Sequence, residues 1–159
     1  MATIVVTGVG GDIGLPVGRI LTEAGHKVIG VDADDAHHAQ AFIHSVERVP
    51  RADDASYLDE LTKLCGMVKA DVVIPCIEVE FPVWTESARK QFPASILALS
   101  PRLTDLFSDK LSTARWLVDK KLGAPASVTI SEIDTLTGPV VVKRRKGSGG
   151  RDMKWIGGS

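Results

Sequence analysis

Residues 3–14, TIVVTGVGGDIG, decide the fold of the first part of the chain. The apolar run TIVVT (3–7) is typical of a buried β-strand, and a glycine-rich turn follows it directly. Glycines in such a turn let the chain reverse sharply and let the next helix start close to the sheet. This strand–turn–helix order predicts the first unit of an α/β sheet.

The same alternation continues to residue 100. Further apolar runs predict strands at 27–32, 45–50, 71–76 and 96–100, and amphipathic patterns predict helices at 15–24, 55–69 and 81–91. The apolar face expected for the first helix consists of Ile13, Val17, Ile20, Leu21 and Ala24. Buried strands joined by helical crossovers form parallel sheets covered on both faces. We therefore expect residues 1–100 to form a Rossmann-like, three-layer α/β/α domain with a parallel sheet.

The composition is that of a soluble globular protein. Hydrophobic residues make up 44% of the 159 residues and charged residues 25%, and the net charge of -1 gives no general attraction to nucleic acid or to an anionic membrane. No apolar run approaches the roughly 20 residues of a membrane helix. Two cysteines, Cys65 and Cys76, are typical of a reducing compartment rather than of a disulfide framework. These features favour a cytoplasmic protein with no nucleic-acid or membrane partner.

The carboxyl edge of the predicted sheet is the expected place for a ligand. The glycine turn, Asp32 and residues 76–80 should all lie along it. The candidate residues for a substrate edge are Gly10, Gly11, Asp12, Glu78 and Glu80. Glu78 and Glu80 would lie on one side of an extended segment, but capping of the next helix is the favoured role for them, with a substrate role as the alternative.

The opening turn also matches the TGxxGxIG pattern of short-chain dehydrogenases. Asp32 stands at the end of the second apolar run, where an acidic residue would bind a ribose hydroxyl of NAD(P). That chemistry needs a tyrosine helped by a lysine four residues later, because a phenol has a pKa near 10. The single tyrosine, Tyr57, is followed four residues later by Leu61. An NAD(P)-binding dehydrogenase or epimerase-type protein is therefore the alternative reading.

The pattern changes after Pro101. The segment SDK (108–110) opens a predicted helix at 109–123, and GPVVVKRR (138–145) predicts a strand. The glycine-rich turn KGSGGRD (146–152) and a short returning strand MKWI (153–156) follow. The side chains expected to face inward from this helix are Leu111, Ala114, Leu117, Val118 and Leu122. So short a hairpin is not expected to be a complete domain, so residues 101–159 are predicted to be the incomplete start of an α+β domain.

Lysines and glycines of this second part have the chemistry of a phosphate site. A triphosphate needs fixed cations and backbone N–H groups that can approach it closely. Lys143 ends a strand and Lys110 opens a helix, where the positive end of the helix dipole would favour an anion. Gly147, Gly149 and Gly150 have no Cβ, so the backbone can close over phosphates and move away again.

The order of these motifs resembles the ATP-grasp superfamily, in particular its carbamoyl-phosphate-synthase-like carboxylate–amine ligases. The resemblance implies a pre-ATP-grasp domain over 1–100 and the start of an ATP-grasp domain over 101–159. It implies that Lys110 and Lys143 hold the ATP phosphates and that Gly147, Ser148, Gly149 and Gly150 form the mobile glycine loop. In such ligases ATP phosphorylates a carboxylate, and an amine or ammonia then attacks the acyl phosphate.

The resemblance also sets limits. Arg144 stands where many relatives have proline. The large-subunit carbamoyl-phosphate synthases use a longer glycine loop and often have arginine at these cation positions, so carbamoyl phosphate itself is not the expected product. Arg145 and Lys146 are expected to be flanking residues. The implied cofactors are ATP and Mg²⁺. The magnesium ligands and the later catalytic arginine should lie beyond Ser159, so no catalytic or metal-binding residue is assigned within this chain, which alone should be inactive.

Other interpretations concern the basic segment, the histidines and the functional class. The basic segment 143–151 could bind nucleic acid or be a solvated turn, although no aromatic residues are interleaved for base stacking. His37, His38 and His44 are expected to be surface residues rather than metal ligands. A non-catalytic nucleotide-sensing module is the alternative from a different functional class.

Overall fold

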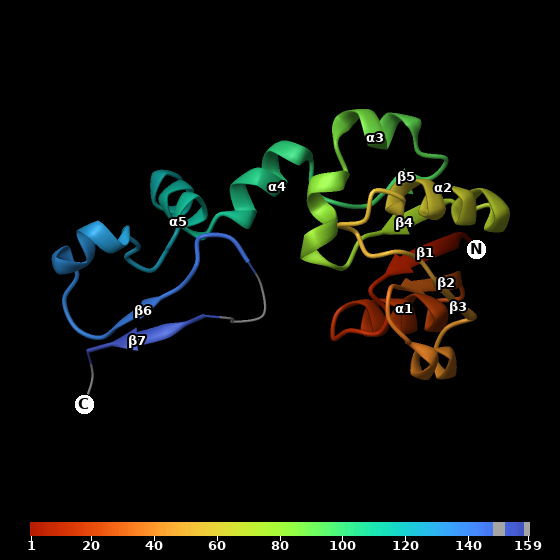
Figure 1. The fold of residues 1–159 in the computed structure, drawn as a ribbon, viewed down its shortest axis with the longest axis horizontal. Coiled ribbons are helices and arrows are strands. Elements are labelled where there is room, and N and C mark those ends of the chain that lie inside the picture. Colours follow the sequence, from red (N-terminus) through yellow and green to blue (C-terminus); the bar gives the residue numbers. More distant parts are fainter. Residues whose placement is uncertain (148–151, 158–159) are drawn as a thin grey trace. The chain divides into compact units, whose positions relative to one another are not determined.

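The computed structural model describes residues 1–147 and 152–157, and the chain divides into two compact units, Met1–Pro101 and Arg102–Ser159 (Figure 1). The first unit contains a five-stranded parallel sheet with the strand order β3-β2-β1-β4-β5. Its strands are β1 (Thr3–Thr7), β2 (Lys27–Asp32), β3 (Ser45–Arg48), β4 (Val72–Ile74) and β5 (Ser95–Ile96). The Rossmann-like parallel sheet predicted from the sequence is confirmed.

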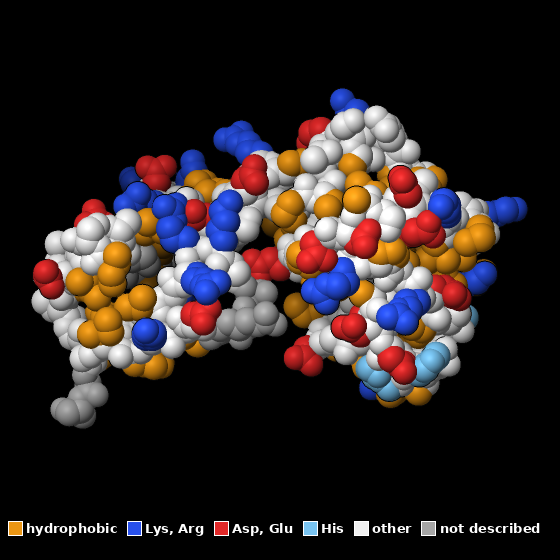
Figure 2. Space-filling view, viewed as in Figure 1, with side chains coloured by type: hydrophobic (Ala, Val, Ile, Leu, Met, Phe, Trp, Pro, Cys, Tyr) orange, Lys and Arg blue, Asp and Glu red, His pale blue; other side chains and the backbone are white. Residues whose placement is uncertain are grey.

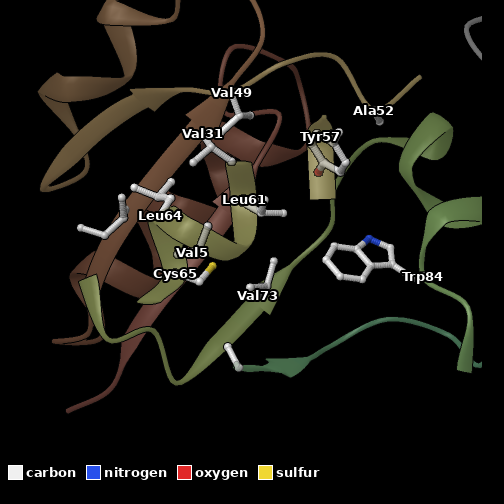
Figure 3. Packing of buried hydrophobic residues seen from close by; sticks show 12 residues of the cluster. Val5, Val31, Val49, Ala52, Tyr57, Leu61, Leu64, Cys65, Val73 and Trp84 are labelled. Carbon is white, nitrogen blue, oxygen red and sulfur yellow. The ribbon is translucent and has the colours of Figure 1, made fainter. Parts of the chain in front are cut away.

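Helical elements cover both faces of this sheet. They are α1 (Gly14–Glu23), η1 (His37–Ala41), α2 (Tyr57–Val68), η2 (Glu78–Val83) and α3 (Glu86–Gln91). Side chains alternate along β1, so Val5 packs with Leu61 of α2 on one face, while Ile4 and Val6 lie in a second apolar cluster with η1 on the other. Figure 3 shows the first cluster, in which α2 lies over β1 and β4. Two apolar clusters separated by one sheet make the three-layer α/β/α architecture.

The predicted apolar face of α1 is wrong at two positions. Ile13 is 62% exposed and Ile20 is 63% exposed, whereas Gly14 and Gly18 are buried. A Cβ on Gly18 would lie 3.0 Å from a side-chain carbon of Ile43, so the helix packs through its glycines. The missing side chains let the helix approach closely and turn the two isoleucines outward.

The segment between β4 and β5 also differs from the prediction. The helix expected at 81–91 is divided into η2 and α3, and the side chain of Thr85 caps α3 by accepting a hydrogen bond from the N–H of Ala88. The strand expected at 96–100 ends at Ile96. The guanidinium of Arg89 donates to the carbonyls of Ala98 and Leu99, so these groups bind a side chain instead of a neighbouring strand.

The second unit has a helical part and a hairpin. Its elements are α4 (Pro101–Ser108), α5 (Lys110–Asp119), η3 (Ile130–Thr135), β6 (Val140–Val142) and β7 (Lys154–Ile156). The antiparallel pairing of β6 with β7 agrees with the predicted hairpin, whereas α4 and η3 were not predicted. Leu111 and Ala114 of α5 are buried as expected, but Val118 is 63% exposed within the helix. Leu122 is 52% exposed and lies beyond the end of α5 at Asp119.

Candidate functional site

The carboxyl edge of the sheet has its topological switch point between β1 and β4. The chain places β2 and β3 on one side of β1, then returns to place β4 and β5 on the other. Parallel α/β sheets bind ligands in the crevice outside such a point. The glycine turn that follows β1 and the segment 75–80 that follows β4 both lie there, as the sequence predicted.

Asp32 closes the glycine turn. Its Oδ2 accepts a hydrogen bond of 2.8 Å from the backbone N–H of Gly10, and its Oδ1 accepts one of 3.0 Å from the N–H of Asp34. The turn itself is tight: Gly8 has a φ of +63° and the N–H of Gly11 donates to the carbonyl of Gly8 over 3.0 Å. Both carboxylate oxygens of the residue predicted to bind a ribose are thus engaged by the protein backbone.

Thr7 links the ends of the two central strands. The backbone N–H of Cys76 donates to Thr7 Oγ1 over 2.9 Å, and the same hydroxyl donates to Glu80 Oε2 over 2.8 Å. A hydroxyl can accept and donate at once, so this chain of two hydrogen bonds joins β1 to the segment after β4. The threonine of the TGxxGxIG pattern therefore has a structural partner in this chain.

Glu80 is a buried carboxyl group with an exposed fraction of only 1%. Burial raises its pKa to about 7, and the hydrogen bond from Thr7 only partly offsets this effect. The buried hydroxyl of Tyr57 interacts with this carboxyl, and burial followed by the charge of Glu80 raises the pKa of the tyrosine. Among the described residues, however, the Tyr57 hydroxyl has no hydrogen-bond partner of good geometry. Glu80 and Tyr57 thus form a buried polar contact beneath the carboxyl edge.

The predicted roles of the two glutamates after β4 need correction. The 3-10 helix η2 replaces the extended segment, so Glu80 is buried while Glu78 stays partly exposed, and the two do not share one exposed side. Glu80 does not cap the next helix, because Thr85 does. Gly11 and Asp12 are exposed at the turn, and Gly10 is exposed but its N–H is already bonded to Asp32.

Lys110 and the glycine turn of the hairpin meet in the second unit. The backbone N–H of Lys110 donates to the carbonyl of Arg145 over 2.9 Å, and its Nζ donates to the carbonyl of Gly147 over 2.5 Å. Lys110 and Gly147 are separated by 37 residues in the sequence. Lys143 is exposed just after β6. Ser148, Gly149 and Gly150, the rest of the predicted loop, lie outside the described residues.

Asp109 occupies the start of α5 and changes the role predicted for that helix end. Its Oδ1 accepts hydrogen bonds from the N–H groups of Leu111 and Ser112, at 3.1 and 3.0 Å. The guanidinium of Arg145, followed by these backbone donors, lowers the pKa of Asp109 to about 2. Two N–H groups at the start of α5 are thus already bound to a carboxylate. The group at this helix end that can attract an anion is therefore the ammonium of Lys110. Asp109 was not predicted as a site residue, although an aspartate directly before a helix is a recognisable capping signal.

The histidines lie on the surface, as expected. His37, His38 and His44 are all exposed, and Figure 2 shows histidine side chains on the outside of the first unit. Within the described parts of the chain, no three histidine, cysteine or acidic side chains come together in a way that could hold a metal ion. The same parts contain no helix with the length and hydropathy to cross a membrane.

Comparison with known families identifies the first unit. Residues 4–97 match the model of the PylC-like, N-terminal domain. The chain belongs to this family. The match covers the sheet from β1 to β5, together with the glycine turn and the Thr7–Glu80 contact, and it confirms the pre-ATP-grasp resemblance predicted from the sequence.

Solved structures share the fold of the PylC-like chain over nearly its whole length. N5-carboxyaminoimidazole synthetase from Staphylococcus aureus, complexed with ADP, superposes with a TM-score of 0.71 at 22% identity, over 99% of this chain and 42% of that one. The biotin carboxylase domain of 2-oxoglutarate carboxylase from Hydrogenobacter thermophilus gives 0.68 at 15% identity, over 97% and 37%. L-amino acid ligase from Bacillus licheniformis gives 0.69 at 16% identity, over 99% and 39%.

The chain thus has the fold of the N-terminal part of ATP-grasp ligases. The chain spans about two fifths of the length of the matching proteins. No curated protein sequence matches it. The likeness supports the ATP-grasp interpretation of the fold and does not favour the dehydrogenase alternative.

Proposed function

We propose that this PylC-like chain is the N-terminal part of an ATP-dependent carboxylate–amine ligase. In the proposed reaction a carboxylate is phosphorylated by ATP, and an amine or ammonia displaces phosphate from the acyl phosphate. Two of the matching structures are complexes with ADP, and one of these also holds magnesium and bicarbonate. They support ATP and Mg²⁺ as cofactors. Small-molecule carboxylates and amines as substrates, and a cytoplasmic location, are further parts of the proposal.

The observation that carries the proposal is the contact of Lys110 with Gly147, the first glycine of the hairpin turn. Two segments predicted to hold phosphates, 37 residues apart, are joined by a hydrogen bond of 2.5 Å from Lys110 Nζ to the carbonyl of Gly147. An ammonium bound to a neutral carbonyl can exchange that partner for a phosphate oxygen, which is a stronger, charge-assisted acceptor. Lys143, just after β6, would supply the second cation, and the loop Gly147, Ser148, Gly149 and Gly150 would cover the phosphates.

The carboxyl edge of the first unit is the proposed place of the substrate. Gly11, Asp12 and Glu78 are at least partly exposed there and can meet a ligand. Gly10 and Glu80, which are bonded to Asp32 and Thr7, would instead fix the shape of this edge. Carbamoyl phosphate as a specific product is not part of the proposal.

A turnover experiment tests this function. Release of ADP by the full-length protein is measured over a panel of carboxylates and amines with Mg²⁺, for the wild type and for Lys143→Ala. We expect ADP release that depends on one carboxylate–amine pair, and a loss of about 100-fold or more in the variant if the lysine stabilises charge on the transferring group. Turnover that persists in Lys143→Ala, with the fold intact, would contradict the proposed phosphate site.

A further inference from the structure

Arg145 and Asp109 form a two-point ion pair in the second unit. The guanidinium donates from Nε to Asp109 Oδ1 over 3.1 Å and from Nη2 to Asp109 Oδ2 over 2.6 Å, across 36 residues of sequence. This is the fork-to-fork geometry in which arginine binds carboxylates most specifically. The pair joins the segment that follows β6 to the residue that caps α5.

The pair differs from its neighbour on the same hairpin. The Arg145 side chain is 58% exposed, but the Asp109 side chain is only 13% exposed, and its Oδ1 also accepts the two backbone bonds at the start of α5. The ion pair of Arg144 with Asp152, at 2.9 Å, joins two side chains that are 73% and 57% exposed. Exposed pairs contribute little, because water screens them and ordering both side chains costs entropy. Asp109, by contrast, is already held in place when Arg145 binds it.

The backbone of Arg145 makes a second contact with α5. Its carbonyl accepts the N–H of Lys110 over 2.9 Å. Arg145 therefore contacts Asp109 through its side chain and Lys110 through its main chain. Lys143 lies two residues before Arg145, so the chain that carries Lys143 is fixed to the helix start that carries Lys110.

We propose that Asp109 and Arg145 are positioning residues that present Lys110, Lys143 and Gly147 together to the phosphates of a nucleotide. This inference rests on the proposed function, and it replaces the expectation that Arg145 is merely a flanking residue. Arg145 acts through Asp109 and does not itself bind the phosphates. Loss of the pair separates the two lysines without removing either charge from them.

A set of variants in the full-length protein tests this role. Arg145→Ala removes the guanidinium, and Asp109→Asn removes the negative charge while keeping an oxygen for the α5 cap. The double variant combines the two changes, and Arg145→Lys keeps the charge without the fork. Arg144→Ala is the matched control, because it removes the adjacent exposed arginine. The dissociation constant of ATP is measured by calorimetry, together with KM for ATP, kcat and the amide exchange rate of Lys110.

The expected result is a shared, non-additive effect. Arg145→Ala and Asp109→Asn should each raise the dissociation constant and KM for ATP about tenfold, and the double variant should do no more than that, because both act through one contact. The change in kcat should be smaller than the change in KM. Arg145→Lys should recover part of the affinity, Arg144→Ala should stay within about twofold of the wild type, and exchange at the Lys110 amide should quicken only where the pair is broken.

Other results separate the inference from the function beneath it. If Lys143→Ala weakens ATP binding while Arg145→Ala behaves like Arg144→Ala, the positioning role is wrong and the phosphate site stands. If Arg145→Ala is far more harmful than Asp109→Asn, or if the two effects add, Arg145 acts directly and not through Asp109. If the wild type binds no ATP, both the proposed function and the positioning role fail.

Discussion

The backbone N–H of Gly10 donates a hydrogen bond of 2.8 Å to Oδ2 of Asp32. The two residues are those in which the sequence most resembles a dinucleotide site. Here the carboxylate serves the turn: it binds Gly10 through one oxygen and the N–H of Asp34 through the other. A ribose hydroxyl would have to share these oxygens with the backbone donors that already hold them.

The first prediction is that this turn binds no dinucleotide. Titration of NAD(H) and NADP(H) into the folded protein, followed by calorimetry, should show no binding in the micromolar range. Gly11→Ala provides the matched variant, since a Cβ at Gly11 would meet the carbonyl of Gly8 at an ordinary contact distance of 3.5 Å and the turn can keep its shape. Micromolar binding that weakens in Gly11→Ala would reinstate the dinucleotide alternative.

The second prediction concerns Gly14, where α1 meets β1. A Cβ there would lie 2.3 Å from the carbonyl oxygen of Gly8 and 2.6 Å from that of Thr7, and backbone atoms cannot move aside as a side-chain tip can. Gly14→Ala should therefore lower the free energy of unfolding by about 3 kcal/mol, as measured by urea denaturation.

Gly66 is the control for that substitution. It lies within α2, and a Cβ there would meet no atom within 4 Å. Gly66→Ala should leave the stability unchanged or raise it by up to about 1 kcal/mol, because alanine loses less backbone entropy in a helix. Equal effects at the two glycines would show that α1 does not approach β1 as closely as described.

The third prediction is a pH dependence that comes from Glu80. Burial raises the pKa of this group from 4.5 to about 7, so the folded state holds the proton more tightly than the unfolded chain does. The contribution of Glu80 is therefore most favourable below about pH 4.5 and becomes less favourable as the pH rises to about 7. The full change amounts to about 3 kcal/mol at most.

Glu80→Gln should remove that part of the pH dependence. The amide keeps an oxygen to accept the hydroxyl of Thr7 and carries no charge at any pH. Urea denaturation from pH 5 to pH 8 should show a smaller loss of stability with rising pH in this variant than in the wild type. Glu47→Gln, at an exposed position, is the control. A wild type and Glu80→Gln with parallel pH profiles would mean that Glu80 titrates as a solvated carboxyl does.

Apolar runs were enough to predict most of the first unit. The runs around β1, β2 and β4 indicated a buried parallel sheet, because a strand covered on both faces needs apolar residues at successive positions. The apolar spacing of α2 likewise predicted its packing face, with Leu61, Leu64 and Cys65 buried. Both signals lie within short stretches of sequence.

The errors arose where distant residues decide the local structure. The spacing of Ile20 fits an apolar helix face, but the close approach of Gly14 and Gly18 to the sheet turns that side chain outward. The length of β5 depends on Arg89, whose guanidinium binds the carbonyls that follow it. A pattern within a short stretch of sequence does not indicate such contacts.

The contacts between residues of the candidate sites likewise could not be predicted from the sequence. The lysines and glycines of the proposed phosphate site could be selected by their chemistry. The pairing of Glu80 with Thr7 spans 73 residues and that of Arg145 with Asp109 spans 36. Sequence spacing therefore indicated which residues to consider, while the fold determined which of them support the others.

The most direct test of the proposed phosphate site is the affinity of the full-length protein for ATP with Mg²⁺, measured by calorimetry in the wild type, Lys143→Ala and Lys146→Ala. Loss of a charge-assisted contact costs about 1.5–3 kcal/mol, so Lys143→Ala should bind ATP at least about tenfold more weakly. Lys146→Ala removes an exposed lysine of the same turn and should bind ATP as the wild type does. Equal ATP affinity in the wild type and in Lys143→Ala, with the fold unchanged, would contradict the account.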